Sequence, residues 1–211
     1  MTRVAAKVEA VAFDLGGVLI DWSASYLYRS LLPDDEAIAA FLEEVGFIDW
    51  NTALDAGRDW DEAVEWLGTR HPRRRDLIEA FRDRWEETLG GPIEPTVEIL
   101  EELRASGVRT FALSNWSRRT FDLAASRFRF LKGFEAVVIS GDVGATKPDP
   151  RIYGELLERG HLRPESTVFI DDSPPNVRSA ISMGIVGVLY LAPEQLRRDL
   201  VGLGLPVSAG S

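Results

Sequence analysis

Five short apolar runs are spaced along the chain and predict its main strands. They span residues 8–15, 108–115, 134–140, 166–172 and 186–191. Val, Ile and Phe are frequent in these runs, which lack the strict alternation of a half-buried strand. Such runs are typical of strands that are covered on both faces, as in a parallel sheet.

Helical patterns lie between these predicted strands. The pattern at 94–107 carries Val97, Leu100 and Leu103 on one face and ends at Gly107. Similar patterns follow at 117–128, 149–160 and 173–184. Strands that alternate with helices predict an α/β fold, with a doubly wound parallel sheet and right-handed crossovers.

Residues 22–90 break this alternation, because no strand pattern follows the first one for a long distance. Helical patterns occupy the stretch instead, at 25–32, 35–47, 60–69 and 73–90. The insert leaves from the carboxyl end of the first strand, where α/β proteins bind their ligands. The triplet Gly90-Gly91-Pro92 is typical of a hinge that returns the chain to the sheet.

The domain boundaries follow from this insert. We expect a core domain of residues 1–21 and 92–211, interrupted by an all-helical cap of residues 22–91. Within the cap, the stretch 51–60 is expected to form a loop that faces the active site. The tail, residues 204–211, is expected to be frayed.

Charge and composition narrow the class of protein. The formal net charge of −10 and the pI near 4.8 argue against nucleic acid or an anionic membrane as partner. The absence of cysteine excludes disulfides, thiol nucleophiles and cysteine-ligated metal sites. No apolar run is long enough to span a bilayer. We therefore expect a cytoplasmic protein, either a monomer or a homodimer.

Polar side chains follow four of the predicted strands. In chain order they are Asp14, Ser114 with Asn115, Lys147, and Asp171 with Asp172. Because the carboxyl ends of parallel strands meet at one edge of the sheet, we expect these groups to converge there. Carboxylates in such a crevice suit a hard cation, and a lysine beside a hydroxyl suits an anionic group on the substrate. At Gly16 and Gly17, backbone N–H groups could approach that anion closely.

These residues belong to four motifs, and their order resembles the haloacid dehalogenase-like (HAD) hydrolase superfamily. The motifs are FDLGGVL (13–19), LSN (113–115), TKPDPRIY (146–153) and VFIDDSPPNV (168–177). The resemblance covers nearly the whole chain and includes a cap in the expected place. It implies a Rossmann-like core with a helical cap, and the opening Asp-Leu-Gly resembles a phosphatase-like branch of the superfamily.

The resemblance also implies roles for the groups that would react. Asp14 would be the nucleophile and form an aspartyl-phosphate that water then hydrolyses. Lys147 would neutralise charge between the nucleophile and the phosphate. Ser114, together with Asn115 and Gly17, would bind the phosphoryl group of a small phosphorylated metabolite.

A magnesium ion is the cofactor that the resemblance implies. Asp14, the backbone carbonyl of Gly16 and Asp171 would hold Mg²⁺, and Asp172 would support it directly or through water. Asn176, at the start of the following helix, would orient the acid pair. Together these assignments predict a Mg²⁺-dependent phosphoric monoester hydrolase.

Gly16 departs from the family pattern. Phosphatases of the superfamily usually carry a second Asp two residues after the nucleophile, as general acid and base, and here that position is Gly16. General acid catalysis contributes on the order of 10²–10⁴-fold. Its absence at position 16 predicts a slow enzyme, a substrate with a good leaving group, or a proton donor from elsewhere in the chain. Asp21, in the turn after the first strand, is a candidate donor.

Aromatic residues in and around the insert suggest the walls of a substrate pocket. Trp22, Trp50 and Trp116 flank the predicted crevice, and Arg58 in the 51–60 stretch is a candidate for substrate contact. The remaining tryptophans are expected in the core of the cap; they are Trp60, Trp66 and Trp85.

Other functions fit parts of the pattern. A 2-haloacid dehalogenase also uses an aspartate nucleophile but needs no metal, which would leave Asp171-Asp172 as a cluster of like charges. A degenerate member could bind a phosphate ligand without turnover. A receiver-type signalling domain fits poorly, because its acid pair would end the first strand rather than the fourth.

Overall fold

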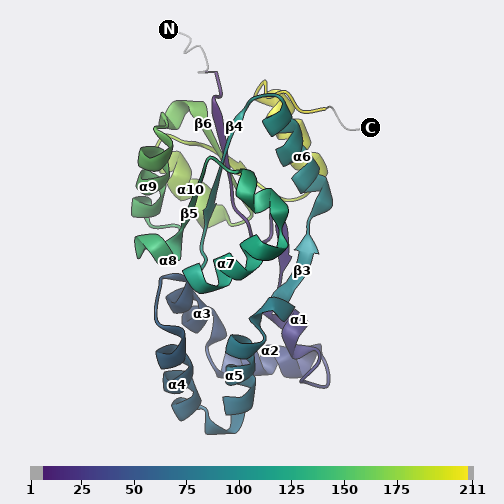
Figure 1. The fold of residues 1–211 in the computed structure, drawn as a ribbon, viewed down its shortest axis with the longest axis vertical. Coiled ribbons are helices and arrows are strands. Elements are labelled where there is room, and N and C mark those ends of the chain that lie inside the picture. The colour runs from purple at the N-terminus through teal and green to yellow at the C-terminus, as the bar shows by residue number, and fades with distance from the viewer. Residues whose placement is uncertain (1–6, 209–211) are drawn as a thin grey trace.

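Five parallel strands form the central sheet, in the order β5-β4-β1-β6-β7. The computed structural model describes residues 7–208, and Figure 1 shows the sheet in the upper half of the molecule. The strands are β1 (Ala10–Phe13), β4 (Arg109–Ser114), β5 (Ala136–Ile139), β6 (Thr167–Asp171) and β7 (Val186–Leu189). Each lies inside one of the apolar runs, and the expected doubly wound α/β fold is confirmed.

Helices cover both faces of this sheet (Figure 1). They are α6 (Glu94–Ala105), α7 (Arg118–Arg127), α9 (Pro150–Gly160), α10 (Pro174–Ser182) and α11 (Pro193–Gly202), with the short α8 (Ser140–Val143) after β5. Side chains of β1 alternate between two hydrophobic clusters. Ala10 and Ala12 pack in the cluster that includes α9 and α10, whereas Val11 and Phe13 pack in the cluster that includes α6 and α11.

Residues 23–88 form a separate group of helices below the sheet in Figure 1, called the helical segment from here on. Its helices are α1 (Ala24–Tyr28), α2 (Asp35–Glu44), α3 (Phe47–Asp55), α4 (Trp60–Arg70) and α5 (Arg75–Asp83). Two 3₁₀ turns flank α5, at Pro72–Arg74 and Trp85–Thr88. Among the helices between residues 7 and 208, none is long and apolar enough to cross a membrane.

The boundary between α2 and α3 corrects the sequence analysis. Gly46 has a φ of 63°, a conformation that glycine adopts without steric cost, and it separates the two helices. The single helix expected at 35–47 therefore ends at Glu44. The expected loop 51–60 is also wrong in its first half, because residues up to Asp55 belong to α3.

Two strands that the sequence does not predict connect the helical segment with the sheet. β2 (Ile20–Trp22) and β3 (Leu89–Pro92) pair antiparallel, with Asp21 opposite Gly91. The two chain crossings therefore run side by side as a ribbon. The expected helix at 73–90 ends at Asp83, and Gly90-Gly91-Pro92 is part of a strand rather than a free hinge.

The chain end is packed as far as the structure describes it. Val207 is buried, and the N–H of Ser208 donates to Glu102 Oε2 of α6 at 2.7 Å. Arg197 of α11 forms an ion pair with the same carboxylate at 2.9 Å. The expectation of fraying is wrong for residues 204–208, while 209–211 lie outside the described residues.

Aromatic side chains build the core of the helical segment around Phe81 of α5. Its ring centroid lies 5.0 Å from that of Phe47, 5.5 Å from Trp50 and 5.7 Å from Trp60. Trp50 is buried here, and its indole N–H donates to the carbonyl of Ala63 at 3.1 Å. The expectation that Trp50 flanks the crevice is therefore wrong.

The Phe81→Ala variant should lose about 3–5 kcal/mol of unfolding free energy, because it removes the ring on which three aromatic side chains pack. Urea titration followed by circular dichroism measures this loss. Ile48→Ala is the matched control: Ile48 is 81% exposed on the same group of helices, and its loss should stay below about 0.5 kcal/mol. Equal losses in the two variants would contradict this packing.

Candidate active site

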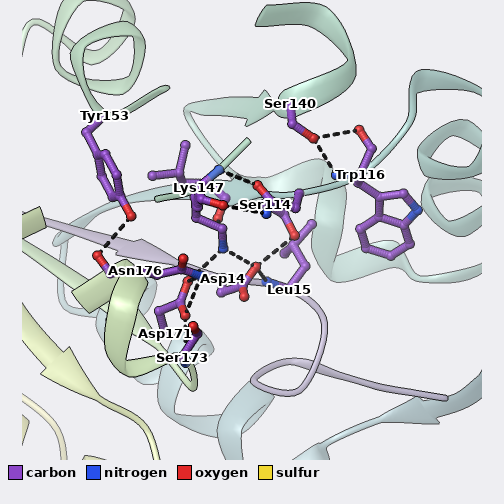
Figure 2. Close-up of polar contacts among 12 residues, drawn as sticks. Asp14, Leu15, Ser114, Trp116, Ser140, Lys147, Tyr153, Asp171, Ser173 and Asn176 are labelled. Atoms are coloured by element: carbon purple, nitrogen blue, oxygen red, sulfur yellow. Dashed lines mark hydrogen bonds and ion pairs between the residues drawn. The ribbon is translucent and has the colours of Figure 1, made fainter. Parts of the chain in front are cut away.

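The register of the sheet brings the polar strand ends together. Phe13 at the end of β1 pairs with Ala112 of β4 and with Ile170 of β6. Asp14 therefore stands beside Asp171, and its N–H donates to the carbonyl of Ile170 at 2.8 Å. Figure 2 shows the side chains that converge on this edge.

The carboxylate of Asp14 is held on one oxygen. Oδ1 accepts hydrogen bonds from the Leu15 N–H at 2.7 Å and from the Ser114 hydroxyl at 2.7 Å, and the Lys147 ammonium lies 2.8 Å away. Among residues 7–208, no hydrogen bond engages Oδ2. Burial raises the pKa of this carboxyl to about 7, although the charge of Lys147 opposes the shift. Oδ2 is therefore the oxygen that remains for an incoming group.

Lys147 lies buried between two carboxylates (Figure 2). Its ammonium is 2.8 Å from Asp14 Oδ1 and 2.7 Å from Asp171 Oδ2, and it donates to the carbonyl of Leu113 at 3.0 Å. Burial alone lowers the pKa of Lys147, but Asp14 and Asp171 outweigh it and raise the pKa above its usual value. The ammonium is therefore charged and neutralises part of the acid cluster.

Asp171 receives further hydrogen bonds from the start of α10. The amide of Asn176 donates to both of its oxygens, at 3.0 and 3.1 Å, and the N–H of Ser173 donates to Oδ1 at 2.8 Å. The hydroxyl of Tyr153 in turn donates to the Asn176 carbonyl at 2.8 Å (Figure 2). Asn176 thus orients Asp171, while no hydrogen bond in the described chain links it to Asp172.

Asn115 and Gly17 have contacts that differ from the expected phosphate contacts. The side-chain amide of Asn115 donates to the Lys147 carbonyl at 3.1 Å and accepts from the Lys147 N–H at 2.7 Å. This reciprocal pair fixes the backbone that carries the lysine. The N–H of Gly17 donates to the Ile20 carbonyl at 2.9 Å, so it closes a turn.

Gly17 also leaves room for Asp172. It has a φ of 76°, and a Cβ at this position would collide with the Asp172 carboxylate. The surroundings of Gly16 are the opposite, because no atom lies within 4 Å of the place a Cβ would occupy. The position where relatives are expected to carry an acid is therefore open space in this protein.

Three carboxylates at this edge fit a divalent cation. Each of Asp14, Asp171 and Asp172 offers an oxygen, and these three atoms lie within 4.8 Å of one another. Oxygen ligands of this kind suit Mg²⁺. Lys147 balances a single negative charge of the three, so a bound cation would offset the remainder.

A cavity of about 240 Å³ opens above these groups. Asp14, Gly16 and Lys147 line its floor, while Trp22, Trp85 and Trp116 line it as aromatic walls. Trp22 and Trp116 thus have the expected place. Trp85 was expected in the core of the cap instead. It is buried there and also lines the cavity, with its ring centroid 5.8 Å from that of Trp116.

Residues from α3 also line the cavity. Asn51 and Asp55 face it across from the strand ends, and the amide of Asn51 donates to Asp55 Oδ2 at 3.0 Å. The sequence analysis singled out the right stretch but missed Asp55. One signal in the sequence pointed to Asp55. The site lacks its usual acid, and the stretch expected to face it contains this carboxylate.

Two other candidates lie away from the cavity. Asp21 is exposed, and both of its carboxylate oxygens accept from the Tyr26 hydroxyl at 2.8 Å. Arg58 lies over the ring of Trp66, 4.9 Å from its centroid, and this tryptophan is 40% exposed. The structure therefore gives no support to three expectations. They are the proton-donor role of Asp21, the substrate contact of Arg58 and the buried position of Trp66.

Comparison with known proteins identifies the family. A model of the haloacid dehalogenase-like hydrolases matches residues 8–184, so the chain belongs to this family of hydrolases, as the motifs predict.

Curated relatives cover this chain almost completely. Drimenol cyclase drtB of Aspergillus calidoustus is 27% identical over 207 residues, which are 96% of this chain and 38% of that protein. Acyl-CoA dehydrogenase family member 10 of Mus musculus is 35% identical over 95% of this chain and 20% of its own length. The chain thus spans well under half of these two proteins. Sesquiterpene phosphatase astK of Aspergillus oryzae is 26% identical over 92% of this chain and 97% of that protein.

Solved structures share the fold. A predicted HAD-like family hydrolase from Porphyromonas gingivalis has a TM-score of 0.70 at 27% identity, covering 94% of this chain and 98% of that one. The HAD family enzyme bt-2542 from Bacteroides thetaiotaomicron, in complex with magnesium and inorganic phosphate, has a TM-score of 0.66 at 20% identity over 88% and 95%. The L-2-haloacid dehalogenase of Xanthobacter autotrophicus, with chloropropionic acid covalently bound, has a TM-score of 0.64 at 18% identity, covering 95% of this chain and 85% of that one.

The Lys147→Met variant should lose about 3–5 kcal/mol of unfolding free energy at neutral pH, because it leaves two buried carboxylates without their shared counter-charge. Urea titration measures the loss. Lys132→Met is the control, since Lys132 is exposed and its replacement should cost less than about 0.5 kcal/mol. A Lys147→Met protein as stable as this control would contradict the buried pairing.

Proposed function

We propose that the chain is a Mg²⁺-dependent phosphoric monoester hydrolase that acts on a small phosphorylated metabolite. The observation that carries this proposal is the grouping of Asp14, Asp171 and Asp172 around one edge, with Lys147 buried among them. Carboxylates for a cation and an ammonium for an anion meet at one cavity, which is the requirement for holding a metal and a phosphate together.

The Mg²⁺ ligands in this proposal are Asp14, Asp171, Asp172 and the backbone carbonyl of Gly16. The bridge between Gly16 and Ile20 uses the carbonyl of Leu15 and the N–H of Gly17, so it leaves the Gly16 carbonyl unused. Bound there, the ion would offset the charge of the acid cluster and of the phosphoryl oxygens.

Asp14 is the proposed nucleophile. One of its carboxylate oxygens attacks phosphorus, the bond from phosphorus to the leaving oxygen breaks, and an aspartyl-phosphate forms. Water then cleaves this intermediate and releases phosphate. Lys147 and Ser114 keep the carboxylate in one orientation during both steps, because each contacts its Oδ1.

The proposed role of the helical segment is that of a cap that encloses a small substrate. The cavity lies between the strand ends and residues of α3, which limits the size of the leaving group. Trp22, Trp85 and Trp116 suit an apolar or planar portion of that group. The phosphatase named among the relatives, which this chain matches over 92% of its length, also supports a phosphate ester as substrate.

The acid cluster also weighs against the dehalogenase alternative. A metal-free dehalogenase would keep Asp14, Asp171 and Asp172 within 4.8 Å of one another with Lys147 as their shared counter-charge. Like charges at such separations oppose ionisation, whereas a phosphatase with a bound cation uses the same cluster as ligands.

Phosphate release from p-nitrophenyl phosphate should need both the nucleophile and the cation. The Asp14→Asn variant should be slower by on the order of 10³-fold or more, as expected when a nucleophile is removed. EDTA should abolish the activity of the native protein, and added Mg²⁺ should restore it. A spectrophotometric assay measures these rates. Full activity of Asp14→Asn would contradict the assignment of the nucleophile. Activity that survives EDTA would contradict the requirement for a metal ion.

Mg²⁺ binding should also be visible without turnover. At a concentration one hundred times its dissociation constant, an ion that binds the folded chain adds about 2.7 kcal/mol, which raises the thermal midpoint by roughly 5–10 °C for a chain of this size. Differential scanning fluorimetry at constant ionic strength measures the shift. Asp172→Asn should shift much less, and Asp49→Asn, an exposed residue of α3, should shift like the native protein. An equal shift in Asp172→Asn counts against the ligand set.

A further inference from the structure

The reaction proposed above lacks a proton donor on the β1 side of the cavity. Gly16 has no side chain, and the space around its missing Cβ is open for 4 Å. Asp21, the next carboxylate after Gly16 along the chain, is exposed and accepts from the Tyr26 hydroxyl. An ester with a poor leaving group nevertheless needs a proton at its leaving oxygen.

Asp55 is a carboxylate that faces this gap. It is the last residue of α3, and it lines the same cavity as Asp14 and Gly16. The amide of Asn51, one helical turn earlier, donates to Asp55 Oδ2 at 3.0 Å. This hydrogen bond fixes the orientation of the Asp55 carboxyl group.

The backbone around Asp55 contacts the chain that follows β5 of the central sheet. The hydroxyl of Ser140 donates to the Asp55 carbonyl at 2.6 Å and accepts from the Trp116 N–H at 2.8 Å (Figure 2 shows the Ser140–Trp116 pair). Two residues on, Gly57 has a φ of 98°, and a Cβ there would lie 3.1 Å from the carbonyl oxygen of Gly141. These contacts hold the end of α3 against the strand ends.

We propose that Asp55 is the general acid and base of this hydrolysis, supplied by the helical segment in place of the missing acid at position 16. The proposal rests on the phosphatase function proposed above. In this structure Asp55 already lines the same cavity as Asp14, and Ser140 holds its backbone there.

Asp55 moves one proton out and one proton in. When Asp14 attacks, the bond from phosphorus to the leaving oxygen breaks, and that oxygen takes the proton from the Asp55 carboxyl. In the second step water attacks phosphorus, the Asp55 carboxylate accepts a proton from that water, and the bond from phosphorus to Asp14 breaks. Both carboxyl groups then return to their starting forms, with an alcohol and phosphate as products.

The electrostatic environment supports this role. Burial raises the pKa of Asp55 to about 8; the backbone of Ser117 opposes the shift, the charge of Asp14 adds to it and Lys147 opposes it. The acid form is thus present at neutral pH and is lost as the pH rises through about 8. The kcat/KM for a poor leaving group should therefore fall above that pH.

The charged groups around Asp55 are few in the described chain. Asp14, Lys147 and Asp172 share the cavity with it. On α8, one of the helices that pack against α3, the Asp142 carboxylate is paired with Arg118. At the start of α4, Asp59 accepts the N–H of Glu62 as a helix cap, and Arg58 lies on Trp66 as described above.

The Asp55→Asn variant separates a proton donor from a structural residue. For 2-phenylethyl phosphate, a poor leaving group, its kcat/KM should fall by about 10²–10⁴-fold and should lose the decline above pH 8. For 2,4-dinitrophenyl phosphate, whose leaving group needs no proton, kcat/KM should change less than about tenfold. A burst of dinitrophenolate should precede slow turnover, because the second step still needs the base. Asp49→Asn on the same helix is the control and should match the native protein with both esters.

A second variant uses the open space at position 16. Adding Gly16→Asp to the Asp55→Asn protein should restore turnover of 2-phenylethyl phosphate at least about tenfold, because a proton donor then stands beside the same leaving oxygen. The matched Gly16→Ala, Asp55→Asn protein should stay slow. This comparison holds even if Asp55→Asn lowers stability, since both double variants carry that change.

The outcomes divide cleanly between the two proposals. If the native protein turns over p-nitrophenyl phosphate with Mg²⁺ but Asp55→Asn keeps its rate with both esters, or loses the same factor with both, the assignment of Asp55 is overturned and the phosphatase function stands. If the native protein releases no phosphate from any of these esters with Mg²⁺, the proposed function fails and the role of Asp55 fails with it.

Discussion

A buried ammonium between two carboxylates is the interaction on which the rest of this site depends. Lys147 lies within 3 Å of both Asp14 and Asp171, and ions buried this deeply are stable only when paired and fully hydrogen-bonded. The surrounding residues meet that condition. Asn115 fixes the backbone of the lysine, and Asn176 fixes the carboxylate of Asp171. Two adjacent parallel strands can therefore end in acids without repelling each other.

Much of this arrangement follows from the sequence, because parallel strands impose it. The five apolar runs, the helices between them and the meeting of Asp14, Ser114 and Asp171 at one edge need local pattern and sheet geometry alone. The ribbon of β2 and β3 could not be predicted in this way. Each strand is short, and its partner lies beyond the whole helical segment, so no local pattern marks the pair. The break at Gly46 was likewise hidden inside a continuous helical pattern.

The walls of the cavity depend on packing at long range, and there the sequence was a poor guide. Trp50 turns into the aromatic group around Phe81, whereas Trp85 lines the cavity. Within the stretch 51–60, the choice between Asp55 and Arg58 was decided by partners elsewhere. The hydroxyl of Ser140, at the start of α8, donates to the backbone carbonyl of Asp55, and the guanidinium of Arg58 packs on the ring of Trp66 in α4. None of these partners can be inferred from spacing along the chain.

Both chain crossings between the helical segment and the central sheet run through the paired strands β2 and β3. Any motion of the helical segment relative to the sheet would therefore bend this ribbon. The close approach of Gly57 to Gly141 lies where the end of α3 meets α8, a different point of contact from that ribbon. A motion that opened the cavity on this side would part these two glycines and carry Asp55 away from Asp14. Entry of the substrate and withdrawal of the proposed proton donor would then occur together. Water that entered the open cavity would meet an incomplete set of reacting groups.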